Sequence, residues 1–231
     1  GNSEVTINKT IRIIAIYVNE AIKKEIIKES PIKYLKLRGA EETTAEALEE
    51  QELKELVSIY HKHIFTGTTH DVLEFFLFMC FSSLHISDAR SLQIDQIGKD
   101  EFWYMRGKMI NIRPRVVRVP ISEPLRQIIN NKRKNRKSGV LWDDMIADQK
   151  VNEKLKQIAS VAGIKKELSA KFGRHTFATI FLRRTRDINT LKDIMGHSNI
   201  KQTLVYAHVL DQDRQLGIKV FDSFYEEKDH K

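Results

Sequence analysis

The fold and the chemistry of this chain depend on one stretch near its C-terminal end, KFGRHTFATIFLRRTRDINTLKDIMGHSNIKQTLVY, which runs from Lys171 to Tyr206. Lys171, Arg174 and His175 stand close together on one predicted helix, His197 follows in MGHSNI, and Tyr206 ends the stretch. Arginine presents a planar fork of donors that matches phosphate oxygens, histidine exchanges a proton near neutral pH, and tyrosine can act as a covalent nucleophile. The grouping predicts a binding site for a phosphate group.

The composition is that of a globular protein with a basic surplus. The chain has 231 residues, of which 41% are hydrophobic and 30% charged, so we expect one domain of about 150–200 residues plus a smaller piece. Lys and Arg number 39 against 31 Asp and Glu, a formal net charge of +8. This charge favours a polyanionic partner such as nucleic acid, although many proteins are mildly basic.

A single cysteine, Cys80, lies in the apolar run FFLFMCF and is expected to be a buried thiol outside any disulfide. The sequence has no signal peptide and no apolar run of the roughly 18–20 residues that a membrane span needs, which predicts a cytoplasmic protein. We find no metal-ligand spacing and expect no cofactor. Because the chain opens with Gly1 and Asn2 instead of Met, we expect a fragment of a longer protein.

The N-terminal part is predicted to be separate from the main domain. Apolar residues at helical spacing predict one amphipathic helix from Val5 to Glu29, stopped by Pro31. A polar connector follows from Lys33 to Glu42. Thr43 and Glu46 then form a predicted capping box, so the main domain is expected to begin near Thr43.

The main domain is predicted to be mainly α with a small antiparallel β-sheet, an α+β fold. A helix from Asp71 to Leu84 is apolar almost all round and should be buried on most sides. Aromatic and β-branched residues predict two strands, from Phe102 to Met109 and from Val116 to Ile121. Further helices are predicted near Ser87, from Glu123, from Val151 to Val161, Ser169 to Arg184, Asn189 to Met195, Ile200 to Val209, and Asp211 to Glu227.

The motifs of the opening stretch carry a family resemblance. Gly-Arg-His-Thr-Phe at 173–177, Gly196-His197 and Tyr206-Ala-His stand in the order typical of the tyrosine recombinase (phage lambda integrase-type) family, which the chain resembles from about Thr43 to Phe224. The resemblance implies three parts: residues 1–30 as the last helix of a truncated core-binding domain, 31–42 as a linker, and 43–231 as the catalytic domain with a C-terminal tail helix. SSLHISDARSLQ and GRHTFAT further resemble integrases of mobile elements from the Bacteroides group.

The resemblance implies a site-specific DNA recombinase or integrase. Tyr206 then matches the nucleophile that attacks a DNA phosphodiester and leaves a 3′-phosphotyrosyl bond, which conserves bond energy without a high-energy cofactor. The implied partners are double-stranded DNA recombination sites, a homotetramer assembled on them, and accessory DNA-bending proteins. Taken alone, Tyr206 has a simpler explanation as an aromatic residue on a helix face.

Four other residues match catalytic positions of the family. Arg174 matches an arginine that grips the non-bridging phosphate oxygens, and Lys171 a His/Lys position that contacts the phosphate. His197 matches a His/Trp position that donates a hydrogen bond to a phosphate oxygen. Lys108, in Arg106-Gly-Lys108-Met, resembles the lysine that protonates the leaving 5′-oxygen. A solvated surface cation is the simpler explanation of Lys171.

The sequence departs from the family at the first catalytic arginine. The family pattern Gly-Leu-Arg-Ile-Ser-Asp reads Ser83-Leu84-His85-Ile86-Ser87-Asp88 in this chain, so His85 takes the arginine position. Either cationic His85 suffices, or another arginine such as Arg90 reaches the phosphate. Two rival hypotheses stay open: a catalytically impaired DNA-binding regulator, and a topoisomerase-like enzyme that nicks and closes DNA.

Further side chains are predicted to contact DNA or to support the site. The basic tract from Asn131 to Lys137 is either a DNA-facing surface or a solvated helix end. Such phosphate contacts would make binding salt-dependent without specifying sequence. The predicted DNA contacts are Arg90, Arg106, Arg113, Arg115, Arg118 and His175, the last of which would pack beside Arg174.

Overall fold

The computed structural model describes residues 4–35, 46–106 and 116–207. The chain divides into two compact units, Gly1–Thr44 and Ala45–Lys231. No helix in these described ranges is both long enough and apolar enough to cross a lipid bilayer.

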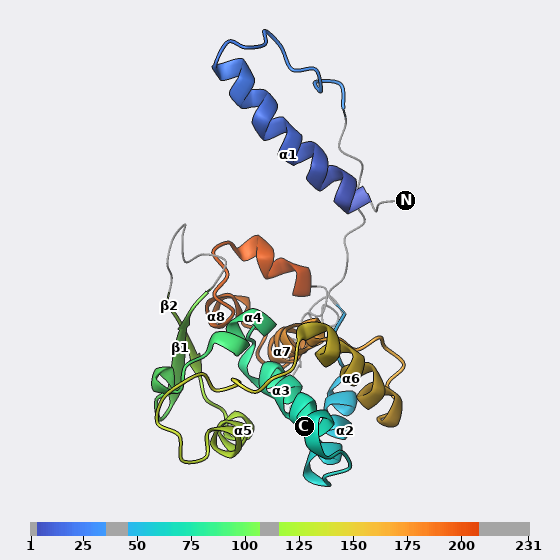
Figure 1. Ribbon diagram of the computed structural model, residues 1–231, viewed down its shortest axis with the longest axis vertical. Helices are drawn as coiled ribbons and strands as arrows, with labels where there is room; N and C mark the ends of the chain where they lie inside the picture. The colour runs from blue at the N-terminus through green and yellow to red at the C-terminus, as the bar shows by residue number, and fades with distance from the viewer. Residues whose placement is uncertain (1–3, 36–45, 107–115, 208–231) are drawn as a thin grey trace, which may run out of the picture. The chain divides into compact units, whose positions relative to one another are not determined.

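The first unit is built on helix α1 (Glu4–Lys23), seen in blue in Figure 1. The prediction that this helix extends to Glu29 is wrong. Glu25 adopts a left-handed conformation with φ of 58°, and the amides of Glu25 and Ile26 donate back to the carbonyls of Ile22 and Ala21. This pattern is a Schellman motif, so the helix ends through its own backbone hydrogen bonds, well before Pro31.

The second unit is organised around α3 (Gly67–Ser82), which lies in the middle of α2 (Glu50–His61), α5 (Glu123–Arg133), α6 (Asp148–Val161) and α7 (Ala170–Thr185) in Figure 1. The predicted burial of α3 on most sides is confirmed: Phe75, Phe76 and Phe78 are wholly buried. Cys80 is buried among them, and burial raises the pKa of its thiol. An all-round apolar helix needs neighbours on every side, which is why α3 occupies the centre.

Helix α7 packs more closely on α3 than a side chain would allow. A Cβ added at Gly173 would lie 2.8 Å from the Cβ of Met79. Because a Cβ is fixed to the backbone, neither helix could avoid this contact without moving away. Gly173 therefore lets α7 lie close to α3, and this approach positions the residues that follow it, Arg174 and His175.

The strands form a two-stranded antiparallel sheet, β1 (Glu101–Met105) and β2 (Val116–Pro120), in which Trp103 lies opposite Arg118. Burial alternates along both strands, as expected for a sheet with one face on the core. The sheet also meets the turn after α8 (Ile188–Ile194): a Cβ at Gly196, where φ is 63°, would lie 2.5 Å from Cγ2 of Val117.

One helix predicted near Tyr206 is not found, and a second lies outside the described residues. The prediction of a helix from Ile200 to Val209 is wrong within the described residues, where two 3-10 turns occur, η3 (Ile200–Gln202) and η4 (Leu204–Tyr206). Thr203 stands between the two turns, and its buried hydroxyl lies 2.9 Å from Nδ1 of His197. The helix predicted from Asp211 lies outside the described residues.

The first helix of the second unit begins later than the sequence predicted. The predicted capping residue Thr43 lies outside the described residues, residues 46–49 are not helical, and α2 begins at Glu50. The Glu49 amide donates to Glu52 Oε2 at 2.7 Å, so a capping box does form, but at this later position.

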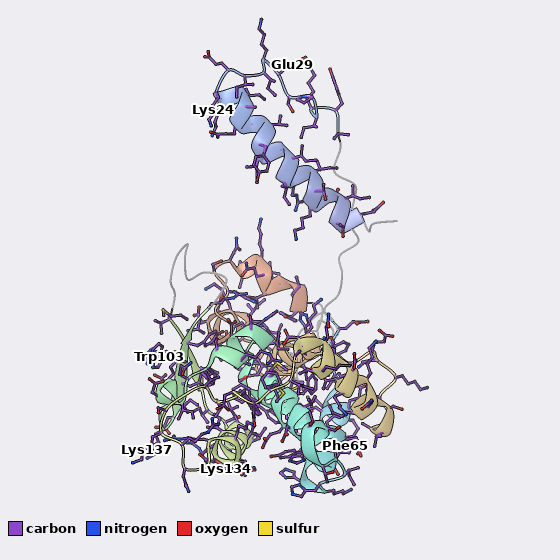
Figure 2. All side chains as sticks on the ribbon, viewed as in Figure 1. Lys24, Glu29, Phe65, Trp103, Lys134 and Lys137 are labelled. Atoms are coloured by element: carbon purple, nitrogen blue, oxygen red, sulfur yellow. The ribbon has the colours of Figure 1, made fainter. Side chains whose placement is uncertain are left out.

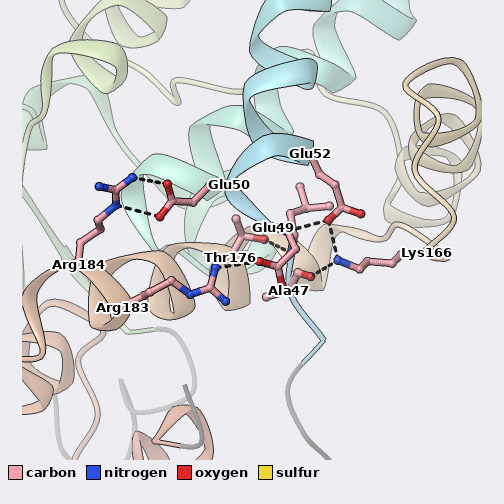
Figure 3. Close-up of polar contacts among 9 residues, drawn as sticks. Ala47, Glu49, Glu50, Glu52, Lys166, Thr176, Arg183 and Arg184 are labelled. Atoms are coloured by element: carbon pink, nitrogen blue, oxygen red, sulfur yellow. Dashed lines mark hydrogen bonds and ion pairs between the residues drawn. The ribbon is translucent and has the colours of Figure 1, made fainter. Parts of the chain in front are cut away.

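Figure 3 shows the contacts that fasten this start to α7 and its neighbour Lys166. The Leu48 amide donates to Thr176 Oγ1 at 2.9 Å. Three ion pairs flank this bond: Arg183 with Glu49, Arg184 with Glu50, and Lys166 with Glu52. The buried amide–hydroxyl bond fixes the position, while the ion pairs, which are partly exposed to solvent, add less energy.

Candidate active site

A pocket of about 500 Å³ collects most of the predicted site residues. Its lining brings together residues from six parts of the second unit: His85, Arg106, Asp148, Lys171, Arg174, His175, His197 and Tyr206. Lys108, Arg113 and Arg115 lie outside the described residues. Within the described ranges no cluster of His, Cys, Asp or Glu could hold a metal ion.

Arg174 is held by backbone carbonyls, with no carboxylate among its hydrogen-bond partners in the described part of the chain. Its Nη1 donates to the carbonyl of Ser83 at 2.6 Å and its Nη2 to the carbonyl of Met195 at 2.7 Å. Burial lowers the pKa of Arg174 from its ordinary value, and the nearby charge of Arg106 adds to this. The guanidinium stays cationic, so its charge is oriented but not neutralised.

His197 is neutral, and its tautomer follows from its partners. Arg174 Nη2 lies 3.0 Å from Nε2 of His197, and because a guanidinium only donates, Nε2 must accept. The ring proton therefore sits on Nδ1, which donates to Thr203 Oγ1 at 2.9 Å. Burial, followed by the charges of Arg174 and Arg106, lowers the pKa of His197 to about 3.

Tyr206 is buried with 3% of its surface exposed, and its hydroxyl lies 2.7 Å from Nδ1 of His175. Burial raises the pKa of Tyr206 to about 12, against the opposing effect of Arg174. Burial, then Lys171, Arg174 and His85, lowers the pKa of His175 to about 4. Near neutral pH the phenol is thus protonated and the imidazole neutral, so the phenol donates and Nδ1 accepts.

His85 stands at the N-cap of α4 (Ile86–Ser91). Its Nδ1 accepts from the Ser87 amide at 3.4 Å and lies 3.1 Å from the Ser87 hydroxyl. An accepting Nδ1 leaves the proton of the neutral ring on Nε2. Histidine at this position therefore caps a helix and lines the pocket, but it offers one donor where an arginine would offer a fork.

Arg90, which the sequence suggested as a substitute for the first catalytic arginine, does not line the pocket, whereas Arg106, predicted as a DNA contact, does. Arg90 is engaged by Asp148 Oδ1 at 2.7 Å and by the carbonyls of Met145 and Ile146. Arg106 donates from Nη1 to the carbonyl of Gly196 at 3.0 Å. The suggestion that Arg90 reaches the phosphate is therefore not supported by the geometry.

The remaining basic candidates are paired away from the pocket. Arg118 forms an ion pair with Glu101 on the neighbouring strand. In the basic tract, Lys132 pairs with Asp144 at 2.6 Å and Arg136 with Asp143 at 2.9 Å. The tract's exposed side chains Lys134 and Lys137 project at the outer edge of the molecule near α5 in Figure 2.

Sequence reasoning missed some of the contacts that build the pocket. Nothing in the sequence pointed to the carbonyls of Ser83 and Met195 as partners of Arg174, because every residue has a carbonyl and these two lie outside α7. Nothing pointed to the hydroxyl of Thr203 as the partner of His197 either. His175 was expected beside Arg174 as a supporting or DNA-contacting residue, whereas it touches Tyr206 directly. The one available signal was its place next to Arg174 in the helix.

The sequence profile of the phage integrase family matches residues 46–213. The chain belongs to the phage integrase family, whose members are tyrosine recombinases. An integrase/recombinase of Escherichia coli is 39% identical over 74 residues, which are 32% of this chain and 22% of that protein. Tyrosine recombinase XerC of Bacillus pumilus is 22% identical over 221 residues, 90% of this chain and 72% of that protein.

Solved structures show the same fold. The Tn1549 transposon integrase in complex with transposon right end DNA superposes with a TM-score of 0.69 at 19% identity, over 96% of this chain and 81% of that one. The catalytic domain of bacteriophage HP1 integrase gives a TM-score of 0.55 at 23% identity, over 79% of this chain and 98% of that one. The mainly α fold with a small antiparallel sheet is that of a tyrosine recombinase catalytic domain. The match to the E. coli relative covers only about a fifth of that protein's length.

Proposed function

We propose that this chain is the catalytic part of a site-specific DNA recombinase or integrase that cleaves and rejoins DNA through a 3′-phosphotyrosyl intermediate. The observation that carries the proposal is the meeting of Tyr206, Arg174 and His197 in one pocket of a phage integrase family member. A tyrosine hydroxyl near a guanidinium that has no carboxylate among its hydrogen-bond partners is suited to attack on a phosphodiester, whose negative charge the guanidinium would stabilise.

The roles follow from the chemistry of each group. The Tyr206 oxygen forms a bond to phosphorus while the bond from phosphorus to the 5′-oxygen breaks, and Lys108 gives the leaving oxygen a proton. Arg174 stabilises the charge of the pentacoordinate transition state, with Lys171 and His197 contacting phosphate oxygens. The reverse sequence reseals a strand, because each bond broken is exchanged for an equivalent one, and no cofactor is required.

Arg106 takes the place of the family's first arginine in this proposal. It lines the pocket, and its charge is felt by both Arg174 and His197. His85 supplies a single further donor at the same site. This arrangement also weighs against the rival reading of a catalytically impaired regulator, since the missing arginine that motivated it has a substitute within the pocket.

The proposal extends to the assembly and the setting of the protein. Residues 1–30 would be the last helix of a truncated core-binding domain, 31–42 a linker, and 43–231 the catalytic domain. The protein would act as a homotetramer on two recombination sites in the cytoplasm, assisted by DNA-bending proteins. A source in a mobile element of the Bacteroides group is supported by the resemblance of SSLHISDARSLQ and GRHTFAT.

Replacing the nucleophile tests the proposal. Tyr206→Phe is expected to bind DNA as the wild type does but to form no covalent adduct on a nicked suicide substrate, because the attacking oxygen is gone. Electrophoresis under denaturing conditions detects the adduct, and Tyr34→Phe, an exposed tyrosine in the first unit, is the matched control. An adduct that persists in Tyr206→Phe would refute the assignment. Relaxation of supercoiled DNA without recombinant product would favour the topoisomerase-like reading.

A further inference from the structure

We propose that His175 is the general base of the reaction, taking the phenolic proton of Tyr206 as the tyrosine attacks phosphorus and returning it when the strand is resealed. The inference rests on the proposed function. In the forward step the proton passes from the Tyr206 oxygen to Nδ1 of His175 while the oxygen–phosphorus bond forms. The 5′-oxygen that leaves phosphorus takes its proton from a separate acid, so the protons balance.

The first support is the contact itself. Nδ1 of His175 and the hydroxyl of Tyr206 are 2.7 Å apart, within the range required of a base and the proton it removes. Among the described residues this is the one hydrogen bond of the Tyr206 hydroxyl. The ring planes are inclined at 50°, so the two rings meet through these polar atoms and not by stacking.

The second support is the protonation state of the Tyr206 phenol and of the His175 imidazole. The buried phenol keeps its proton and the imidazole keeps its lone pair on Nδ1, as the directions of their pKa shifts require. Lys171, by contrast, lines the pocket as an exposed ammonium group, which has three donors and no acceptor. Of the described groups that line this pocket, His175 is the acceptor that touches the phenol.

The third support is the way substrate would change the base. The pKa of His175 is lowered by burial and by three neighbours, Lys171, Arg174 and His85. A bound phosphodiester would place a negative charge among these same groups and offset their effect. Binding of DNA would thus raise the pKa of His175 and make it a stronger base when the phosphate is in place. The other ionisable groups that line the pocket are Arg106, Asp148, His197 and Tyr206.

The fourth support is that the base is held rigidly. His175 sits on α7 between Arg174, whose fork is bound by two carbonyls, and Thr176, whose hydroxyl accepts from the Leu48 amide. Gly173 fixes the same turn of helix against α3. A base carried on such a segment keeps its distance to the nucleophile as the reaction proceeds.

The test is His175→Asn, because the Asn side-chain oxygen can accept the same hydrogen bond but cannot take the proton. The measured quantity is the single-turnover rate of covalent adduct formation on a suicide substrate at saturating DNA. Loss of a general base is expected to slow the reaction about 100-fold to 10,000-fold near neutral pH. Thermal melting and DNA affinity establish that the variant is folded and binds.

The pH dependence separates a base from a positioning residue. Without a base the reaction needs phenol that has already ionised, and this fraction rises about tenfold per pH unit below the phenol's pKa. The deficit of His175→Asn relative to the wild type should therefore shrink steadily between about pH 6 and about pH 9. His63→Asn is the matched control: His63 is exposed with φ of 49°, a conformation that Asn tolerates.

Each outcome decides between the alternatives. A deficit that narrows with pH supports the general base. A deficit that is the same at every pH means that His175 only positions Tyr206, and wild-type rates in His175→Asn mean that it does neither; both overturn the inference and leave the proposed function intact. Failure of the wild type itself to form an adduct overturns the proposed function, and with it the inference.

Discussion

The two groups of cations in the second unit, the pocket and the basic tract from Asn131 to Lys137, differ in what surrounds their charges. In the tract, Arg136 donates to Asp143 and to the carbonyls of Val140, Lys132 and Leu141. In the pocket, the hydrogen-bond partners of Arg174 are two carbonyls and a neutral imidazole. The tract is the denser in positive charge along the sequence, yet its charges are partly matched by carboxylates.

The comparison indicates that an anion-binding site is marked by cations without carboxylate partners, and not by a high density of positive charge along the sequence. Lys132 has a second partner, the ring of Trp142 at 5.1 Å, so it helps to close a loop over the core. Burial and then the nearby charge of Arg106 lower the pKa of Arg174, and such repulsion between cations is often found where a protein binds an anion. We therefore expect the pocket to govern catalysis and the tract to govern stability.

Among variants that compare the pocket with the basic tract, the largest effect is expected from Arg106→Ala. Loss of one clamp on a transition-state oxygen should slow adduct formation by about 100-fold to 1,000-fold, measured by single-turnover cleavage at saturating DNA. Adding His85→Arg should restore most of the rate, because it returns a guanidinium to the position where the family has one.

The double variant distinguishes a direct contact of Arg106 with the phosphate from a purely structural role. If Arg106 only holds the carbonyl of Gly196, the double variant will stay as slow as Arg106→Ala. Arg118→Ala, which removes an arginine paired with Glu101 outside the pocket, is the control and should cleave at close to the wild-type rate.

An intermediate effect is expected from Arg136→Ala in the tract. Loss of several hydrogen bonds from a partly exposed side chain should lower the free energy of unfolding by about 1–2 kcal/mol, measured by denaturant titration. The slope of DNA affinity against salt concentration should not change. A slope lower by about one unit would instead mean that Arg136 contacts a DNA phosphate. Lys137→Ala, which removes an exposed lysine of the same tract, should alter neither quantity.

The smallest effect, and one of opposite sign, is expected from Ser83→Gly. Ser83 has φ of 60°, and its buried hydroxyl has no hydrogen-bond partner in the described structure. Glycine adopts this conformation without strain and removes the unsatisfied group, so stability should rise by about 1 kcal/mol. Thermal melting measures the change. A fall in melting temperature would show that the hydroxyl has a role in holding the Ser83 carbonyl against Arg174.

The sequence predicted those parts of the molecule that depend on local pattern. The all-round apolar character of α3 and the aromatic and β-branched residues of β1 and β2 were sufficient to place the core and the sheet. The family motifs brought Arg174, His197 and Tyr206 into one expected site, and the pocket contains all three.

What the sequence could not predict depends on partners that are distant along the chain. Arg90 and Arg106 were both predicted as DNA contacts, and nothing in the sequence distinguished them. In the fold, Arg90 donates to Asp148 and Arg106 donates to the carbonyl of Gly196. The early end of α1 depends on one residue, Glu25, adopting a left-handed conformation that glutamate rarely takes. Thr203, which stands between the two 3-10 turns, is likewise bonded to a residue of another segment, Nδ1 of His197.

That bond has a consequence for how His197 could serve a bound phosphate. With its proton on Nδ1 and its Nε2 accepting from Arg174, the neutral ring has no hydrogen on Nε2 to give to a phosphate oxygen. A threonine hydroxyl can donate as well as accept, so the ring can keep its contact with Thr203 in either neutral tautomer. If a phosphate oxygen replaced Arg174 as the partner of Nε2, the Thr203 hydroxyl would donate to Nδ1 and the ring proton would sit on Nε2. One hydroxyl would thus let His197 change from acceptor to donor without a net uptake of protons.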